Sequence, residues 1–147
     1  SSAATIPVTL KTVNQDLGVN QNVASFVVPV GATINMDGTA IMQGLATVFI
    51  AQMSGIDLTL FQYGQVVLLA VATSIGTAAV PSAGTITLII ILQQFNLPLE
   101  AIGIILAVDR VLDMIRTSVN VTGDAAIACI VAKSENQLDE SIFNAHK

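Results

Sequence analysis

Six polar side chains recur at helical spacing in a run that is otherwise apolar from Leu99 to Ala132. They are Asp109, Asp113, Arg116, Thr117, Asn120 and Asp124. At about 100° per residue these side chains fall on one face of a helix, within an arc of about 100°. The pattern predicts one long helix over residues 99–133, with a polar stripe on an apolar surface.

The apolar segment over residues 22–53 is interrupted near its middle by small and polar residues, which run from Gly31 to Thr39. Glycine loses much backbone entropy in a helix, and asparagine and aspartate bond to nearby backbone groups instead. We therefore expect two half-helices joined by unwound backbone. The carbonyl groups around Gly31 and Thr33 would then be free to coordinate a cation.

Residues 58–95 contain two shorter apolar stretches, separated by the small residues from Ser74 to Gly84. Each stretch is shorter than the roughly 20 residues that a membrane-spanning helix needs. The pattern therefore predicts a re-entrant helical hairpin. Residues 1–16 are expected to form a short amphipathic helix, and residues 134–147 a polar, exposed C-terminal tail.

The composition indicates a membrane protein. Hydrophobic residues make up 53% of the chain and charged residues 10%, and the mean hydropathy is +0.77. A net charge of −5 argues against a nucleic-acid partner. The expected fold class is an all-α membrane protein with a broken transmembrane helix, a re-entrant helical hairpin and a long polar-striped transmembrane helix. Charged residues inside such a protein face its interior or a cavity and mark a substrate or ion path.

Several motifs occur in a specific order along the chain. They are Ser1–Thr5, Asn35–Thr39, Ser74–Ala78, Asp113–Thr117 and Asn120–Asp124. Together they resemble the glutamate and aspartate transporter family, the dicarboxylate/amino acid:cation symporters that include the excitatory amino acid transporters. The resemblance covers nearly the whole chain.

The resemblance implies that the chain is the C-terminal part of a transport domain within a longer protein. Residues 1–16 would be half of a first re-entrant hairpin, and residues 22–53 a broken helix. A second hairpin (58–95), the striped helix (99–133) and the C-terminal tail would follow. The family would further imply a multi-pass protein of the cell membrane, in contact with lipid and assembled as a homotrimer in its full-length form.

Arg116 carries a planar, permanently protonated guanidinium group, which suits two-point pairing with a carboxylate. The resemblance implies that it binds the side-chain carboxylate of glutamate or aspartate, and that Asp113 binds the substrate's α-ammonium group. A competing interpretation is that Arg116 pairs with Asp113 or Asp109 only to neutralise the helix. The resemblance adds other residues around the substrate, namely Ser2, Thr39, Ala79, Gly84, Thr117 and Asn120.

The resemblance also implies sodium sites. The residues of the first site would be Gly31, Asn35, Asn120 and Asp124, and Asn35 with Asp37 would contribute to a second. A third would use residues that contribute mainly backbone carbonyls, namely Thr33, Met36, Ser74, Ile75 and Thr77. An alternative for the Asn and Asp residues in the break is that they cap the two half-helices.

The expected function is sodium-coupled symport of glutamate or aspartate by alternating access, and not an enzyme activity. One alternative is a proton-coupled symporter of glutamate or a C4-dicarboxylate. A distant alternative is an intramembrane aspartyl protease, because a close pair of carboxylates among the aspartates could share a proton. The cation of Arg116 opposes such sharing. An inert structural piece of a channel is a further possibility.

Overall fold

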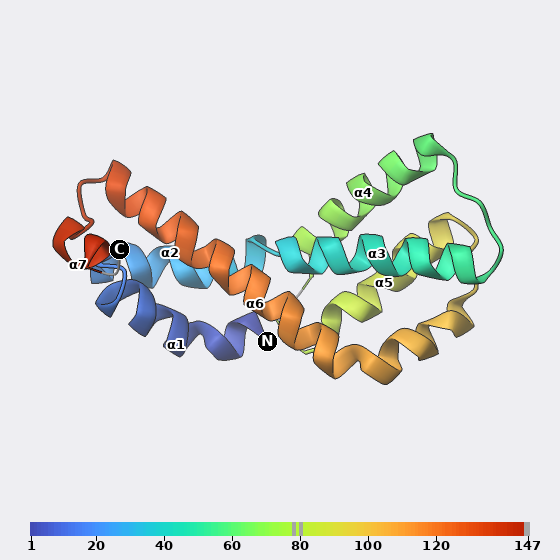
Figure 1. The fold of residues 1–147 in the computed structure, drawn as a ribbon, viewed down its shortest axis with the longest axis horizontal. Helices are drawn as coiled ribbons and strands as arrows, with labels where there is room; N and C mark the ends of the chain where they lie inside the picture. The colour runs from blue at the N-terminus through green and yellow to red at the C-terminus, as the bar shows by residue number, and fades with distance from the viewer. Residues whose placement is uncertain (78, 80, 146–147) are drawn as a thin grey trace.

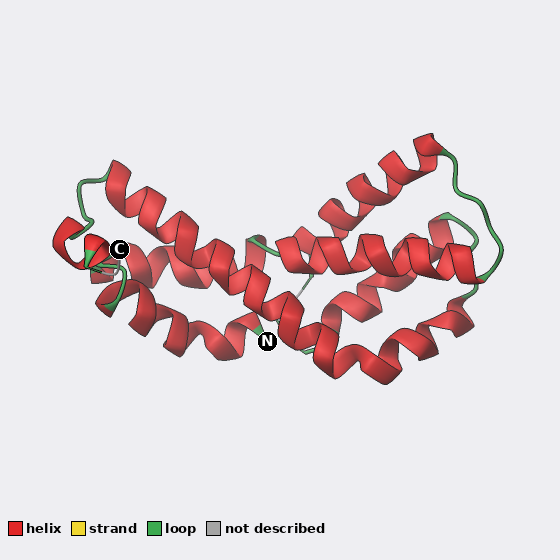
Figure 2. Ribbon diagram, viewed as in Figure 1, coloured by secondary structure: helices red, strands yellow, loops and turns green. Residues whose placement is uncertain are grey.

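The structure is a computed structural model that describes residues 1–77, 79 and 81–145. Regular secondary structure in these residues is helical throughout, as expected (Figure 2). The elements are α1 (Ser2–Gln15), α2 (Gln21–Ile34), α3 (Asp37–Met53), α4 (Leu60–Ile75), α5 (Ala83–Gln94), the 3-10 turn η1 (Leu99–Ala101), α6 (Ile102–Ser134) and α7 (Glu140–Asn144).

Helix α6 runs along the molecule and joins two groups of helices (Figure 1). Its C-terminal half packs with α1 and α2 around an apolar cluster of Val13, Val19, Ala24, Val28, Ala128 and Ala132. Its N-terminal half packs with α3 and α5 around a second cluster, whose most buried members are Ile50, Leu88 and Leu92. Burying one such side chain contributes about 1.5–3 kcal/mol. The middle of α6 lies where the two groups meet.

The predicted break in the segment 22–53 is present but shorter than expected. Only Asn35 and Met36 lie between α2 and α3. The backbone N–H of Asn35 donates to the carbonyl of Gly31 at 2.7 Å, so α2 is wound through Gly31 and Thr33. The expectation of unwound backbone around these two residues is wrong. Gly31 serves packing instead, because a Cβ there would lie 2.5 Å from Oδ1 of Asp124.

Helices α4 and α5 form the predicted hairpin and pack against α3. Helix α4 begins with a capping box between Thr59 and Gln62, which satisfies backbone groups at its first turn. The hairpin tip reaches the centre of the molecule, near the N-terminus of α1 (Figure 1). There the Ser1 hydroxyl donates to the carbonyl of Ala79 at 2.6 Å. Ala78, part of a predicted motif, lies outside the described residues.

Most residues of the described C-terminal tail are exposed, as the sequence predicts, but its backbone is attached to the rest of the chain. The backbone of residues 137–139 pairs with the turn between α1 and α2, through Asn20 N–H to Gln137 O at 3.0 Å and Asp139 N–H to Gly18 O at 2.8 Å. This pairing places Leu138 against the apolar cluster of α1 and α2. Leu138 and the backbone pairing therefore attach the end of α6 to the turn between α1 and α2.

The outer surface is apolar, while the polar stripe faces inward. Side chains such as Leu60 (89% exposed), Phe61 (76%) and Met114 (72%) lie on the outside. The buried members of the stripe are Asp109, Arg116, Asn120 and Asp124. Asp113 and Thr117 are half-buried. None of the helices in the described ranges is both long and apolar enough to cross a membrane.

Candidate functional site

Four segments converge at the middle of α6: the N-terminus of α1, the break between α2 and α3, the hairpin tip, and α6 itself (Figure 1). They enclose a polar cavity with about 240 Å³ of empty space, part of it open to solvent. Its lining residues are Ser1, Ser2, Met36, Thr39, Thr77, Ala79, Gly84, Asp113, Arg116, Thr117 and Asn120. Every residue that the sequence analysis places around the substrate lines this one cavity.

Among the described residues that line the cavity, Arg116 carries the only cationic side chain, and it is 5% exposed. Its Nη2 donates to the Asp113 carboxylate. Its Nη1 is buried and has no hydrogen-bond partner in the described part of the chain. Leaving a buried donor unsatisfied costs about 1–3 kcal/mol, and more for a charged group. Pairing with Asp113 therefore uses only part of the guanidinium group and leaves one donor for a ligand.

Two glycines bring neighbouring helices close to Arg116. A Cβ at Gly84 would lie 2.8 Å from Arg116 Nη1 and 2.9 Å from Thr39 Cγ2. A Cβ at Gly38 would lie 2.4 Å from the Arg116 carbonyl oxygen. Helices α5 and α3 can approach α6 this closely only without a side chain at these positions.

Asn120 connects three of the segments. Its Oδ1 accepts from the backbone N–H of Gly38 at 2.8 Å. Its Nδ2 lies 3.5 Å from Ser2 Oγ, 3.4 Å from Thr39 Oγ1 and 3.4 Å from Met36 Sδ. Because this amide contacts α1, the break and α3, it holds the walls of the cavity together.

The four residues expected at the first sodium site also lie together. Asn35 Nδ2 donates to Asp124 Oδ1 at 2.9 Å and to the carbonyl of Asn120 at 3.2 Å. Gly31 lies against the Asp124 carboxylate, and a Cβ at Gly123 would lie 2.4 Å from Asn35 Nδ2. Asp124 is 1% exposed. The cluster thus presents hard oxygen atoms in a buried position.

The remaining predicted cation residues are less concentrated. Met36 and Thr77 line the cavity, and Ser74 is buried nearby in α4. By contrast, the side chains of Thr33, Asp37 and Ile75 are exposed. Among the described residues, no three His, Cys, Asp or Glu side chains form a group that could hold a metal ion. A cation here would therefore depend largely on neutral oxygen atoms.

Sequence reasoning missed a set of polar contacts around the first turn of α5. Gln43, which is fully buried, donates to the Gly84 carbonyl at 3.1 Å and to Thr87 Oγ1 at 2.6 Å, and accepts from Thr73 Oγ1 at 2.9 Å. An amide in the middle of the apolar α3 was the available signal. Asp109 belonged to the predicted stripe, but its partners in α5 could not be read from spacing.

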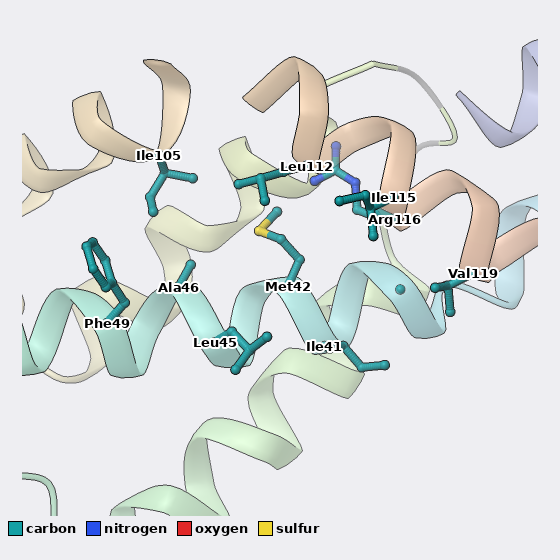
Figure 3. A pocket seen from close by; sticks show the side chains of 11 residues that line it. Ile41, Met42, Leu45, Ala46, Phe49, Ile105, Leu112, Ile115, Arg116 and Val119 are labelled. Carbon is teal, nitrogen blue, oxygen red and sulfur yellow. The ribbon is translucent and has the colours of Figure 1, made fainter. Parts of the chain in front are cut away.

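A larger groove lies between α3 and α6, with about 740 Å³ of empty space (Figure 3). Met42 and Leu112 face each other across it, and Phe49 lies at one end. Arg116 is the only charged residue of its lining, and the other ten residues are apolar or glycine. The groove lacks polar groups that would orient a charged ligand, so the polar cavity is the candidate site.

Comparison with known proteins matches residues 1–134 to the model of the sodium:dicarboxylate symporter family. The chain belongs to this family. The family resemblance drawn from the motifs is therefore confirmed. Members of the family are transporters and not enzymes, so the protease alternative is wrong. The geometry agrees, because the carboxylates of Asp109, Asp113 and Asp124 are bound to hydroxyl, guanidinium and amide groups respectively.

Individual family members are similar over nearly the whole chain. An excitatory amino acid transporter of Caenorhabditis elegans is 50% identical over 131 residues, which cover 89% of this chain and 26% of that protein. Excitatory amino acid transporter 2 of Homo sapiens is 47% identical over 150 residues, which cover 100% of this chain and 26% of that protein. The chain thus spans about a quarter of the length of these relatives.

Proposed function

We propose that this chain forms the substrate- and cation-binding core of a sodium-coupled symporter for glutamate or aspartate. The observation that carries the proposal is that Arg116 lines the polar cavity and that its buried Nη1 has no hydrogen-bond partner among the described residues. A substrate carboxylate would satisfy it by a charge-assisted hydrogen bond. The names of the relatives, excitatory amino acid transporters, support an acidic amino acid as the substrate.

Asp113, the acid that pairs with Arg116, restricts the class of substrate that the cavity would bind. Asp113 also lines the cavity and is half-buried, so it can accept from an α-ammonium group as well as from Arg116. A plain dicarboxylate has no ammonium group for Asp113, and a neutral amino acid has no second carboxylate for Arg116. An acidic amino acid carries both groups. Ser2, Thr39, Thr117, Asn120 and the tip residues would surround it.

The residues around Asp124 fit a sodium ion. Sodium is a hard cation that favours carboxylate and carbonyl oxygens. Asp124 Oδ1 and the Asn120 carbonyl both lie within 3.2 Å of Asn35 Nδ2, so the amide donor now occupies the place between them. Turning this amide about its Cβ–Cγ bond would put a third oxygen there. Sodium would supply the positive charge that compensates the buried carboxylate.

The exposed apolar side chains of the chain support a location in a membrane. Many large apolar side chains lie exposed on the outside while Asp109, Arg116 and Asp124 are buried, an arrangement unlike that of an ordinary soluble domain. We place this surface against lipid and against the rest of a longer protein in the cell membrane. The homotrimer implied by the resemblance would form through parts outside this chain.

Transport would proceed by alternating access. The hairpin tip, which Ser1 binds through the Ala79 carbonyl, would open to admit substrate and close when substrate and cation are both bound. Asn120 links the two sites, since its side chain lines the substrate cavity and its carbonyl faces Asn35. Coupling of this kind is reciprocal, so sodium must raise substrate affinity by the factor by which substrate raises sodium affinity.

Titration of the full-length protein carrying this chain with aspartate, glutamate, malate and serine, in sodium and in potassium, tests the proposal. We expect binding of an acidic amino acid only in sodium. Arg116→Cys should weaken that binding by up to about 100-fold, since a charged hydrogen bond contributes up to about 3 kcal/mol and each 1.4 kcal/mol is tenfold. The control is Arg110→Cys, an exposed arginine of the same helix.

Three results would contradict the proposal. Unchanged affinity in Arg116→Cys would refute the role of Arg116. Equal binding in sodium and potassium, with a dependence on pH, would favour the proton-coupled alternative. Tighter binding of malate than of either amino acid would refute the role of Asp113.

A further inference from the structure

Asp109 is a buried carboxylate that the proposed substrate and cation sites do not use. It is 4% exposed and lies on α6, about two turns before Arg116. Its Oδ2 accepts from the Ser82 hydroxyl at 2.5 Å, and its Oδ1 accepts from the Thr85 hydroxyl at 2.6 Å. Both carboxylate oxygens therefore bind the beginning of α5, in the hairpin.

Ser82 adopts an unusual conformation for this contact. It precedes α5 as the N-cap residue, yet its hydroxyl makes no capping hydrogen bond to the helix. Its φ of 62° lies in the left-handed region, which costs a non-glycine residue about 1–2 kcal/mol. Such a conformation persists only where surrounding contacts impose it. The hydroxyl bond to Asp109 is one such contact, and the Ser82 carbonyl, which accepts from the amides of Thr85 and Ile86, provides others.

Thr85 gives a second, independent indication that Asp109 holds the beginning of α5. Other buried or half-buried threonines, such as Thr47 and Thr87, return their hydroxyl to a carbonyl of their own helix. The Thr85 hydroxyl instead crosses to Asp109 on α6, and the side chain is 1% exposed. The N-cap residue Ser82 and Thr85 in the first turn of α5 therefore both bind the same carboxylate and not a group of their own helix.

The turn bound in this way covers the substrate cavity. Gly84 lies between Ser82 and Thr85, and a Cβ on it would be 2.8 Å from Arg116 Nη1. The position of Gly84 over the guanidinium group thus depends on the two residues that flank it. Opening of the hairpin would break both bonds to Asp109.

We propose that Asp109 is a positioning residue for substrate retention: its bonds to Ser82 and Thr85 hold the hairpin closed over Arg116. This inference rests on the proposed function, since it concerns the same cavity. Asp109 does not contact the substrate. It acts by favouring the closed hairpin, so its loss should speed substrate release without removing the groups that recognise the substrate.

Hydrogen exchange of the full-length protein without substrate tests the contact directly. Asp109→Asn preserves the shape of the side chain but replaces one acceptor oxygen with a donor. We expect the amides of Thr85 and Ile86, which bond to the Ser82 carbonyl, to exchange about tenfold faster, because bonds to a charged group are among the stronger ones. The matched control is Asp57→Asn, an exposed aspartate. Wild-type protection in Asp109→Asn would overturn the inference.

Substrate release tests the consequence. The dissociation rate of labelled aspartate should rise about tenfold in Asp109→Asn and several-fold in Thr85→Val, while Thr122→Val, at an exposed threonine of α6, should not change it. In the double variant Asp109→Asn/Thr85→Val the dissociation rate should be close to that of Asp109→Asn alone, because both substitutions remove the same hydrogen bond. Additive effects, or an unchanged rate in both single variants, would overturn the inference.

The two measurements separate this inference from the proposed function. A wild-type protein that binds neither aspartate nor glutamate would refute the proposed function and the link from Asp109 to substrate. The exchange measurement would still decide whether Asp109 holds α5. A wild-type protein that binds aspartate, with Asp109→Asn releasing it at the same rate, would refute only the inference.

Discussion

A methyl group added at Gly84 should disturb the cavity more than its size suggests. In Gly84→Ala the new Cβ would meet Arg116 Nη1 at 2.8 Å and Thr39 Cγ2 at 2.9 Å, both about 0.5 Å inside the 3.4 Å at which ordinary contact begins. These atoms belong to α6 and α3, and Asp113 holds the guanidinium group in place. Either α5 must move outward or Arg116 must leave its position.

The size of the effect follows from the cost of overpacking, which is about 1–3 kcal/mol. If this cost falls on the closed, substrate-bound form, aspartate affinity should fall by about 5- to 150-fold. Alanine also favours a helix over glycine by up to about 1 kcal/mol, which works in the opposite direction. The net change should still be a loss of affinity.

Isothermal titration with aspartate in sodium, on the full-length protein, measures this change. The control is Gly64→Ala, because a Cβ at that helical glycine would meet nothing within 4 Å. Gly64→Ala should bind aspartate as the wild type does. If Gly84→Ala also binds with wild-type affinity, the close fit of α5 against Arg116 does not govern binding and the reasoning fails.

Three further predictions concern other contacts. Gly31→Ala should weaken sodium activation of transport roughly tenfold, since its Cβ would lie 2.5 Å from Asp124 Oδ1; an unchanged sodium dependence would remove Gly31 from the proposed site. Gly18→Ala should lower the melting temperature more than Gly55→Ala, because both glycines have positive φ but only Gly18 is crowded, by the Asp139 carbonyl at 2.5 Å; equal losses would mean that backbone strain alone matters. Hydrogen bonds from the first turn of α7 hold the pKa of Asp139 below its usual range, so the ionised carboxylate stabilises α7 at neutral pH. NMR should therefore show this helix fraying as the pH falls through that lowered pKa. Fraying as the pH rises would contradict this prediction.

The helices of this chain were predictable because their signals are local. The polar stripe of α6 is a periodic pattern within one segment, and its inward orientation follows from the cost of exposing charge to an apolar environment. The residues around the cavity could be collected from motifs. The motifs could not show which of these residues pair with each other. Arg116 had two candidate aspartates on its own helix, and in the folded chain it pairs with Asp113.

Other features depended on contacts between distant segments. Gly31 suggested unwound backbone, yet it lies in a wound helix. A glycine fits there because Asp124 occupies the space that a side chain would need. The Ser82 hydroxyl binds Asp109 and does not cap α5, a contact that no local pattern indicates. The tail was predicted to be an exposed end, yet Leu138 packs against an apolar cluster. In each case the local preference was weaker than a contact that exists only after folding.

Residue order alone therefore specifies an all-helical chain with a broken helix, a hairpin and a striped helix, because helix period and segment length are properties of neighbouring residues. Folding decides that the N-terminus of α1, the break, the hairpin tip and α6 meet around one guanidinium group, whose Nη1 has no partner among the residues that the structure describes. That arrangement arises from side-chain packing between segments up to 118 residues apart, such as Ser2 and Asn120, and no periodic pattern encodes it.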